Sequence, residues 1–231
     1  MIMKQLPVSL TPTETRLGFA AWGLQMLVLP VALQMLLSQL APHWGEAQQN
    51  FVYHALSFLA LTAVMLRFLR QSGKAALVRP FYALRIAFYG YVLYWVGFLA
   101  VTWTLLQFAP GFANTNDGSI ALLLQENYPL TAIIVLFLAP ISEELVYRGL
   151  VFGTLHSRSR LAAYCISTAV FASIHVLGYL GSQDFLQLGL CFLQYIPAGL
   201  TLAWVYDRTG TIWAPIILHM TINQTSILSL R

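Results

Sequence analysis

Two adjacent glutamates lie inside an apolar stretch, in the segment Pro-Ile-Ser-Glu-Glu-Leu-Val-Tyr-Arg-Gly that covers residues 140–149. At membrane depth each ionisable group costs about 2.5 to 3.5 kcal/mol, so these side chains are expected to face the interior of a helical bundle. On a helix Glu144 and Arg148 share one face and can pair, whereas Glu143 points about 100° away. We therefore expect one carboxylate to be held by Arg148 and the other to be free for chemistry. The alternative is a buried structural ion pair with a spare acid.

Two histidines and an asparagine lie in later apolar stretches. His175 ends the segment Phe-Ala-Ser-Ile-His at 171–175, and His219 and Asn223 frame the segment His-Met-Thr-Ile-Asn, each pair at helical i, i+4 spacing. The turn between the fourth and fifth apolar stretches centres near 158–159, and Glu143 and His175 lie about equally far from it. Antiparallel helices with equal rise bring these two positions to the same depth. His219 is expected at a similar depth, in the cytoplasmic half of the membrane. The three stretches are thus expected to converge on one cavity.

Side chains of these types can hydrolyse a peptide bond. An unpaired carboxylate, Glu143, can act as general base on water, and a histidine can share the proton and pass it to the leaving amine. A second imidazole and an amide can donate hydrogen bonds to the oxyanion that develops on the scissile carbonyl. His175, His219 and Asn223 supply these groups. Each histidine taken singly is more often a packing residue, but their joint occurrence with two acids at matching depth favours a site.

The composition indicates the kind of structure that must position these residues. Hydrophobic residues make up 58% of the 231 residues and charged residues only 9%, against about 25% charged in soluble proteins. So few charges cannot cover a water-exposed surface. Intrinsic disorder, nucleic-acid binding and a secreted disulfide scaffold are excluded, because each needs high charge or many cysteines. The sequence predicts an all-α, polytopic transmembrane helical bundle with an interior catalytic cavity.

About seven apolar stretches approach the roughly 20 residues that a helix needs to cross the hydrocarbon core. The predicted spans cover residues 17–40, 51–69, 86–108, 129–156, 161–180, 185–206 and 212–229. The first is too long for a cleavable signal peptide and lacks a small-residue cleavage site, so it is expected to be retained.

Basic residues alternate between the predicted connections. They occur in the amino-terminal tail and in the second, fourth and sixth connections, whereas the connections at 41–50, 109–128 and 181–184 carry no Lys or Arg. The positive-inside rule therefore predicts a cytoplasmic amino terminus and an outer carboxyl terminus. Residues 110–117, which contain Gly and Asn, are expected to form an ordinary loop. Asp207, next to Arg208, is expected to lie in a solvated cytoplasmic turn.

Three motifs together resemble the signature of a known family. They are Glu143-Glu144-x-x-x-Arg148, Phe171-x-x-x-His175 and His219-x-x-x-Asn223. In this order they are similar to the motifs of the type II CAAX prenyl endopeptidases and the bacteriocin-processing or self-immunity proteins, the CPBP intramembrane protease family. The segment Thr-Gly-Thr-Ile-Trp-Ala-Pro at 209–215 resembles the family's lead-in to its last motif. The resemblance covers about residues 130–226, so we expect amino-terminal transmembrane helices at 1–128 and a CPBP-like catalytic core at 129–231, within a single integral-membrane domain.

The resemblance implies a glutamate-dependent, metal-independent intramembrane peptidase with no cofactor. Glu143 would activate water with His175, His219 and Asn223 would form the oxyanion site, and Glu144 with Arg148 would hold the framework. The implied partners are the lipid bilayer and a peptide or membrane-protein segment as substrate, with no role for nucleic acid, and the implied location is a bacterial plasma membrane. Eukaryotic members act on prenylated CAAX proteins, but the sequence shows no prenyl-binding groove.

Two other functions are compatible with the same residues. Two histidines and one carboxylate could bind zinc with a water in an intramembrane metalloprotease, although the chain has no His-Glu-x-x-His motif. A cavity with these groups could also bind a peptide without turnover, as in a non-catalytic bacteriocin-immunity protein. The sequence makes no prediction of the oligomeric state.

Overall fold

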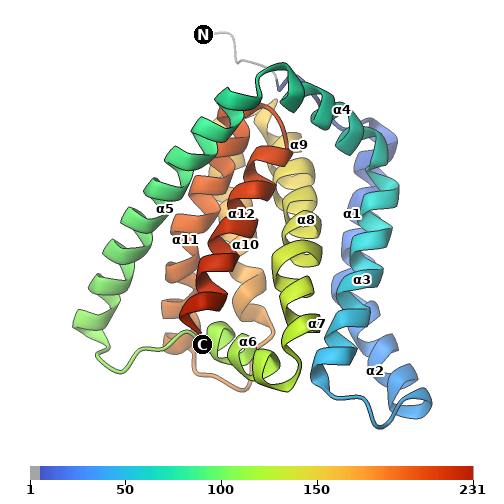
Figure 1. Ribbon diagram of the computed structural model, residues 1–231, viewed down its shortest axis with the longest axis vertical. Helices are drawn as coiled ribbons and strands as arrows, with labels where there is room; N and C mark the ends of the chain where they lie inside the picture. Colours follow the sequence, from blue (N-terminus) through green and yellow to red (C-terminus); the bar gives the residue numbers. More distant parts are fainter. Residues whose placement is uncertain (1–5, 231) are drawn as a thin grey trace.

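Helices account for 84% of the structure, and no strand forms within residues 6–230, the part of the chain that the computed structural model describes (Figure 1). In lipid every backbone polar group needs a partner inside the protein, and a helix provides those partners within its own segment. The predicted all-α fold is confirmed.

The helices run up and down the molecule, with α4 across one end and α6 across the other (Figure 1). Their bounds are α1 (Pro12–Leu27), α2 (Leu29–Leu40), α3 (Glu46–Val64), α4 (Leu66–Val78), α5 (Pro80–Phe108), α6 (Thr115–Glu126), α7 (Tyr128–Ile133), α8 (Ala139–Glu144), α9 (Gly153–His156), α10 (Arg160–Leu177), α11 (Phe185–Thr209) and α12 (Trp213–Ser229). Two π-helical segments, η1 (Ile134–Leu138) and η2 (Leu145–Phe152), join α7, α8 and α9 into one long helix.

Four helices are long and apolar enough to cross a membrane: α5, the long helix Tyr128–His156, α10 and α11. Two bent pairs, α1 with α2 at 49° and α3 with α4 at 77°, raise the number to six if each pair forms one span. With 17 residues, α12 falls short of the usual length of about 20. The expectation of about seven spans is compatible with this range. The predicted second span differs most, because the chain bends after Val64 and forms α4 where a connection was expected.

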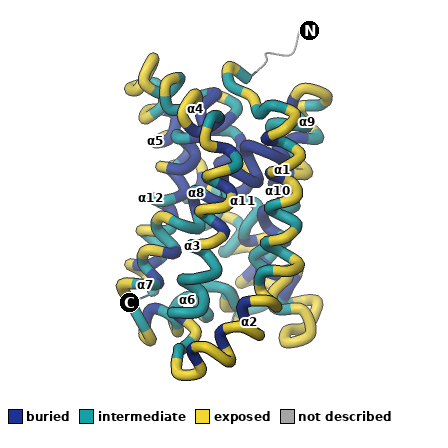
Figure 2. Tube along the Cα trace, turned by 90° about the vertical axis from the view of Figure 1, so that its right-hand side faces the viewer, coloured by how far each residue is buried: buried dark blue, intermediate teal, exposed yellow. Residues whose placement is uncertain are grey.

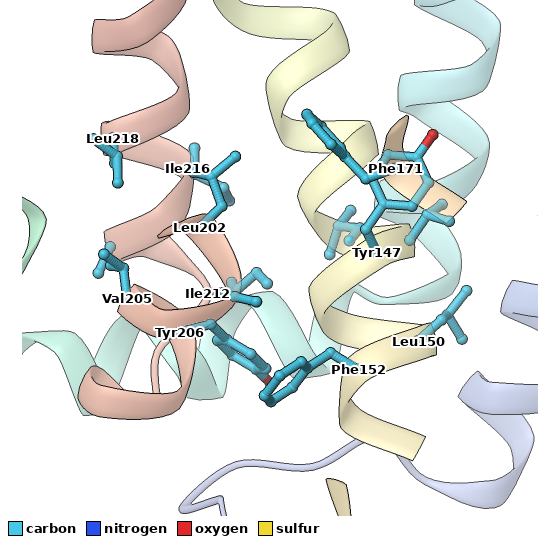
Figure 3. Packing of buried hydrophobic residues seen from close by; sticks show 14 of the residues in the cluster. Tyr147, Leu150, Phe152, Phe171, Leu202, Val205, Tyr206, Ile212, Ile216 and Leu218 are labelled. Carbon is cyan, nitrogen blue, oxygen red and sulfur yellow. The ribbon is translucent and has the colours of Figure 1, made fainter. Parts of the chain in front are cut away.

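The central helix of the bundle is α11. Over half of its apolar window, 56%, is buried inside the protein, against 17% for α5, which lies at the edge of the bundle (Figure 1). Figure 2 shows the buried residues gathered around α8 and α11, whereas α2 is largely exposed. Aromatic rings fill the core between the long helix and its neighbours (Figure 3): Tyr147 packs on Phe171 at 5.4 Å, and Phe152 on Tyr206 at 5.7 Å. The aromatic core therefore packs around η2, the segment that directly follows both glutamates.

The prediction that Asp207 lies in a solvated turn is wrong. Its side chain is only 8% exposed and lies on α11, which continues to Thr209. The carboxylate accepts hydrogen bonds from the Tyr164 hydroxyl at 2.9 Å and from Arg160, and it lies 3.1 Å from His156 Nε2. These partners lie on α9 and α10, far from Asp207 in the sequence. The adjacent Arg208, on which the prediction was based, carries no information about them.

The expectation of an ordinary loop at 110–117 is also partly wrong, because α6 begins at Thr115 within it. The side chain of Asn114 caps the helix, accepting hydrogen bonds from the backbone N–H groups of Asn116 at 3.0 Å and Asp117 at 3.3 Å. Asparagine is a favoured N-cap residue, so the run Asn-Thr-Asn-Asp carried a signal for a helix start.

A close approach between α10 and α11 yields a stability prediction. A Cβ atom added at Gly199 would lie 2.7 Å from Thr168 Cγ2 and 3.2 Å from Thr168 Cα, whereas one added at Gly189, on the same helix, would meet no atom within 4 Å. Gly199→Ala should therefore lower the free energy of unfolding by about 1 to 3 kcal/mol through overpacking. Gly189→Ala is the matched control and should unfold at the same temperature as the wild type or at a slightly higher one. Thermal unfolding of the purified variants in detergent measures both, and equal midpoints would show that the helices can separate without cost.

Candidate active site

The long helix that carries both glutamates is irregular on either side of them. The segment α8, which ends in Glu143 and Glu144, lies between the π-helical segments η1 and η2. Pro140 explains the first irregularity, because proline has no N–H and its ring disturbs the preceding turn. In η1 the N–H of Ala139 bonds to the carbonyl of Ile134, five residues earlier. The equivalent partner of the Val135 carbonyl would be the nitrogen of Pro140, which has no hydrogen to donate.

The carbonyl of Val135 instead accepts a hydrogen bond from the side chain of Asn223, with an Nδ2 to O distance of 2.8 Å. This bond ties α12 to the long helix just before the glutamates. An asparagine amide has two N–H donors, and no other described residue accepts the second one from Asn223. Asn223 is thus oriented by one N–H and can offer the other to the cavity that it lines.

Glu143 projects between two imidazoles. Its Oε2 lies 3.9 Å from Nε2 of His175 and 3.9 Å from Nε2 of His219. The Glu143 side chain is 21% exposed, yet Oε2 itself is buried and has no hydrogen-bond partner among the described residues. Three residues from three different helices therefore meet around one carboxylate oxygen.

The hydrogen bonds on the far side of each ring orient both imidazoles. His175 Nδ1 lies 2.8 Å from the carbonyl oxygen of Phe171, and His219 Nδ1 lies 2.8 Å from Oε1 of Glu144. A carbonyl or an ionised carboxylate can only accept, so Nδ1 carries the hydrogen in both rings. In the neutral form of each ring, the lone pair of Nε2 consequently faces Glu143.

Glu144 points away from Glu143 and is completely buried. Its Oε1 pairs with Arg148 Nη1 at 3.0 Å, and both side chains are 0% exposed. Arg148 Nη2 also donates to the carbonyl of Gly199 on α11 at 3.1 Å. The guanidinium lies over the ring of Phe171, 4.8 Å from its centre. Glu144 and Arg148 thus connect the long helix, α10, α11 and α12 beneath the site.

The glutamate and histidine cluster opens into a cavity of about 490 Å³. Glu143, His175, His219 and Asn223 all line it, together with residues of α3, α5 and α6. Besides Glu143, the charged side chains in the described wall are Glu46 and Asp117, and no Lys or Arg contributes to it. On α6, burial raises the pKa of Asp117 from 3.8 to about 6.

The sequence analysis missed three groups that orient the site. Two are backbone carbonyls, those of Val135 and Gly199, which carry no side-chain signal. The third is Tyr195, whose ring stacks on the imidazole of His175 with centroids 4.2 Å apart. Tyr195 lies in an apolar helix rich in aromatic residues, so its sequence context does not distinguish it from a packing residue.

The arrangement can perform acid–base chemistry on a bound carbonyl compound. It offers one carboxylate oxygen, two oriented imidazoles and one amide N–H within a protected cavity. Within residues 6–230 no group of three or more His, Cys, Asp or Glu side chains has spacing that could hold a metal ion.

Comparison with known proteins gives consistent relatives. Residues 125–225 match the family model of the type II CAAX prenyl endopeptidase Rce1-like proteins. A Bacillus subtilis protein that carries the name membrane peptidase YdiL is 32% identical over 117 residues, which cover 50% of this chain and 43% of the relative. The membrane-embedded CAAX protease MroQ of Staphylococcus aureus is 26% identical over 145 residues, covering 62% of this chain and 56% of the relative.

A third relative, the UPF0177 protein YxdF of Lactococcus lactis, is 28% identical over 86 residues, covering 37% of this chain and 42% of the relative. The chain spans about half the length of the curated relatives it matches. No solved structure matches it significantly. Both glutamates, both histidines, Asn223 and the carbonyls that orient them lie within the matched segment. Residues 125–225 of this integral membrane protein are therefore similar to the domain of the Rce1-like type II CAAX prenyl endopeptidases.

Proposed function

We propose that the protein is an intramembrane peptidase in which Glu143 activates the attacking water. The observation that carries this proposal is the buried Oε2 of Glu143, which has no hydrogen-bond partner among the described residues and lies 3.9 Å from Nε2 of both His175 and His219. A water molecule hydrogen-bonded to this oxygen would lie within reach of both rings. The family match of residues 125–225 supports the same reaction class.

His175 is the proposed carrier of the proton. Its Nδ1–H is held by the Phe171 carbonyl, so its Nε2 is free to accept the proton that Glu143 removes from water. Protonated Nε2 can then donate to the nitrogen of the leaving amine as the peptide bond breaks. The proton therefore moves from water to the leaving group without crossing bulk solvent.

His219 and Asn223 are the proposed donors to the oxyanion. His219 would take up a proton from solvent at Nε2 before the substrate binds and keep it through the cycle. The carboxylate of Glu144, which accepts the Nδ1–H of His219, stabilises the resulting positive charge on the ring. That Nε2–H and the second N–H of Asn223 can then donate to the oxygen of the tetrahedral intermediate. In this scheme Glu144 and Arg148 hold the framework and touch no substrate.

The positive-inside rule adds a proposed orientation in a bacterial plasma membrane. The basic connections lie at the end of the molecule where α4 and α9 are found, and α6 lies at the opposite end (Figure 1). A cytoplasmic amino terminus would place α4 on the cytoplasmic side and α6 on the outer side. A peptide would then reach Glu143 through the part of the cavity that α6 lines.

Replacing the proposed base tests the mechanism. Glu143→Gln keeps the shape of the side chain and removes the base, so proteolysis should fall by about 10²- to 10⁴-fold. Mass spectrometry of membrane peptides from cells that express the wild type or the variant measures this change and identifies the substrate from the new termini.

Glu126→Gln is the matched control for that experiment. Glu126 Oε1 accepts the backbone N–H of Ala47 at 3.1 Å, and a glutamine oxygen can accept the same bond. This control should give the wild-type set of termini. Full biological function of Glu143→Gln would instead favour a protein that binds a peptide or confers bacteriocin immunity without turnover.

The charges of the cavity wall suggest the kind of substrate. The described wall contains carboxylates and no Lys or Arg, so a free carboxyl terminus would find no cationic partner there. We therefore propose an internal peptide segment with a basic side chain that reaches Asp117. Because the pKa of Asp117 is raised to about 6, its carboxyl group is neutral below that pH and charged above it.

The KM of such a peptide should fall by about threefold to fivefold as the pH rises from 5 to 7, since a partly exposed ion pair contributes about 1 kcal/mol or less. Asp117→Asn should remove this pH dependence of KM and leave kcat nearly unchanged. A peptide with glutamine in place of its basic residue is the control. The substrate assignment is wrong if both peptides show the same pH profile.

A zinc-dependent reaction is the second candidate, although the described His, Cys, Asp and Glu side chains form no group with metal-ligand spacing. Both Nε2 lone pairs face Glu143, and each Nδ1–H is held by an acceptor. Ligating histidines commonly show this arrangement. The proposed metal-free mechanism predicts that dialysis against a strong chelator leaves the peptide cleavage rate unchanged. Loss of cleavage on chelation and its recovery on adding zinc would replace that mechanism with a metal-dependent one.

A further inference from the structure

The hydrogen bond from His175 to Phe171 fixes only one edge of the imidazole. The ring can still pivot about the line from Nδ1 to the carbonyl oxygen, and such a pivot would move Nε2 away from Glu143. His175 lies two residues before the last residue of α10, Leu177, and its side chain is 15% exposed. A second contact is needed to set the plane of the ring.

Tyr195 on α11 makes that second contact. Its ring stacks on the imidazole of His175 with a centroid distance of 4.2 Å and an interplanar angle of 28°. The Phe171 ring contacts the same imidazole at 4.7 Å and 53°. The near-parallel stack with Tyr195 opposes tilting of the imidazole out of its plane, because tilting would bring the two rings into steric conflict.

The hydroxyl of Tyr195 is in turn held by α6. It accepts a hydrogen bond from Asn116 Nδ2 at 3.0 Å and donates to Asn114 Oδ1 at 3.5 Å. Asn114 Nδ2 donates to Gln194 Oε1 at 2.7 Å, which links the start of α6 to α11 a second time. Tyr179, in the turn after α10, donates to Asn116 Oδ1 at 3.3 Å. The start of α6 thus fixes the hydroxyl end of Tyr195, while the face of its ring stacks on His175.

From these contacts we infer that Tyr195 is a positioning residue for His175 and that α6 acts on the reaction through it. The inference rests on the proposed role of His175 as proton carrier. Tyr195 sets the plane of the imidazole, and Asn114 and Asn116 hold Tyr195. A displacement of about 1 Å in a reacting group can cost about 10²-fold in rate. An imidazole of His175 that pivots should therefore lower the rate of the chemical step, kcat, and change KM much less.

Removing the aromatic ring is the first test. Tyr195→Leu should lower kcat by about tenfold to a hundredfold, with KM changed by less than about threefold. Tyr195→Phe keeps the stack and loses only the hydroxyl, so it should recover kcat to within about threefold of the wild type. The assay uses a quenched-fluorescent peptide that spans the cleavage site identified by mass spectrometry. Equal loss of kcat in the Phe and Leu variants would show that stacking does not position His175.

Tyr89→Leu is the matched control. Tyr89 lies on α5, is 49% exposed and contacts the ring of Phe88, away from the cavity. The substitution removes the same ring from a surface position, so kcat and KM should stay at the wild-type values. Thermal unfolding of each variant shows whether a lower kcat reflects loss of folded protein.

A double-mutant cycle tests the role of α6. Asn116→Leu removes the donor to Tyr195, and its effect on kcat should match that of Tyr195→Phe, about threefold. If α6 acts through the hydroxyl, the double variant should be no slower than either single variant. Additive effects would show that Asn116 influences the reaction by another route.

Nitrogen NMR of the histidines tests the positioning without any substrate. In protein labelled with ¹⁵N-histidine, the resonances of His175, identified by their loss in His175→Gln, should show Nδ1 protonated and Nε2 unprotonated in the neutral ring. In Tyr195→Leu the Nδ1–H stays bonded to the Phe171 carbonyl, so the Nδ1 shift should hold while the Nε2 shift moves as its lone pair turns away from Glu143. Unchanged shifts would overturn the inference. If Glu143→Gln proves as active as the wild type, the proposed peptidase fails, and this spectrum still tests the contact between Tyr195 and His175.

Discussion

The site depends on a buried ion pair between Glu144 and Arg148. Two charges at this depth are tolerated when they neutralise each other. Arg148 reaches the Gly199 carbonyl on α11, and Glu144 accepts Nδ1–H of His219 on α12. The ion pair itself lies within the long helix, and its two further contacts connect that helix to α11 and α12. Arg148 and His219 both bind Oε1 of Glu144, which does not line the cavity. Its neighbour Glu143 lines the cavity with a buried oxygen that no described residue binds.

An irregular backbone supplies the remaining contacts. Pro140 leaves the Val135 carbonyl without its helical partner, and an unpaired carbonyl in a membrane is costly unless another group satisfies it. Asn223 satisfies it, so the residue that supports the proposed oxyanion site also repairs the helix. π-Helical segments occur often at functional sites, and here η1 and η2 flank the two glutamates. The same local distortion thus places Glu143 and orients Asn223.

The cavity is built from more of the chain than the segment that matches the family. Residues 125–225 contain the glutamates, the histidines and Asn223. The opposite wall comes from α3, α5 and α6, which precede that segment. The predicted division at residue 128 therefore runs through the cavity wall and stays a prediction as a domain boundary.

The sequence by itself determined the helical membrane fold and the common depth at which Glu143 and His175 meet. Apolar stretches of about 20 residues can only be helices in lipid, and the helical rise brings Glu143 and His175 to one level. The i, i+4 spacing likewise placed Glu144 beside Arg148. Tertiary structure alone decided which groups orient the site. The carbonyl of Val135, the ring of Tyr195 and the amides of α6 act across helices whose rotation and separation follow from packing, and periodicity along one helix carries no information about its neighbours. For the same reason the sequence context of Asp207 predicted a solvated side chain, whereas the structure buries it among partners from two other helices.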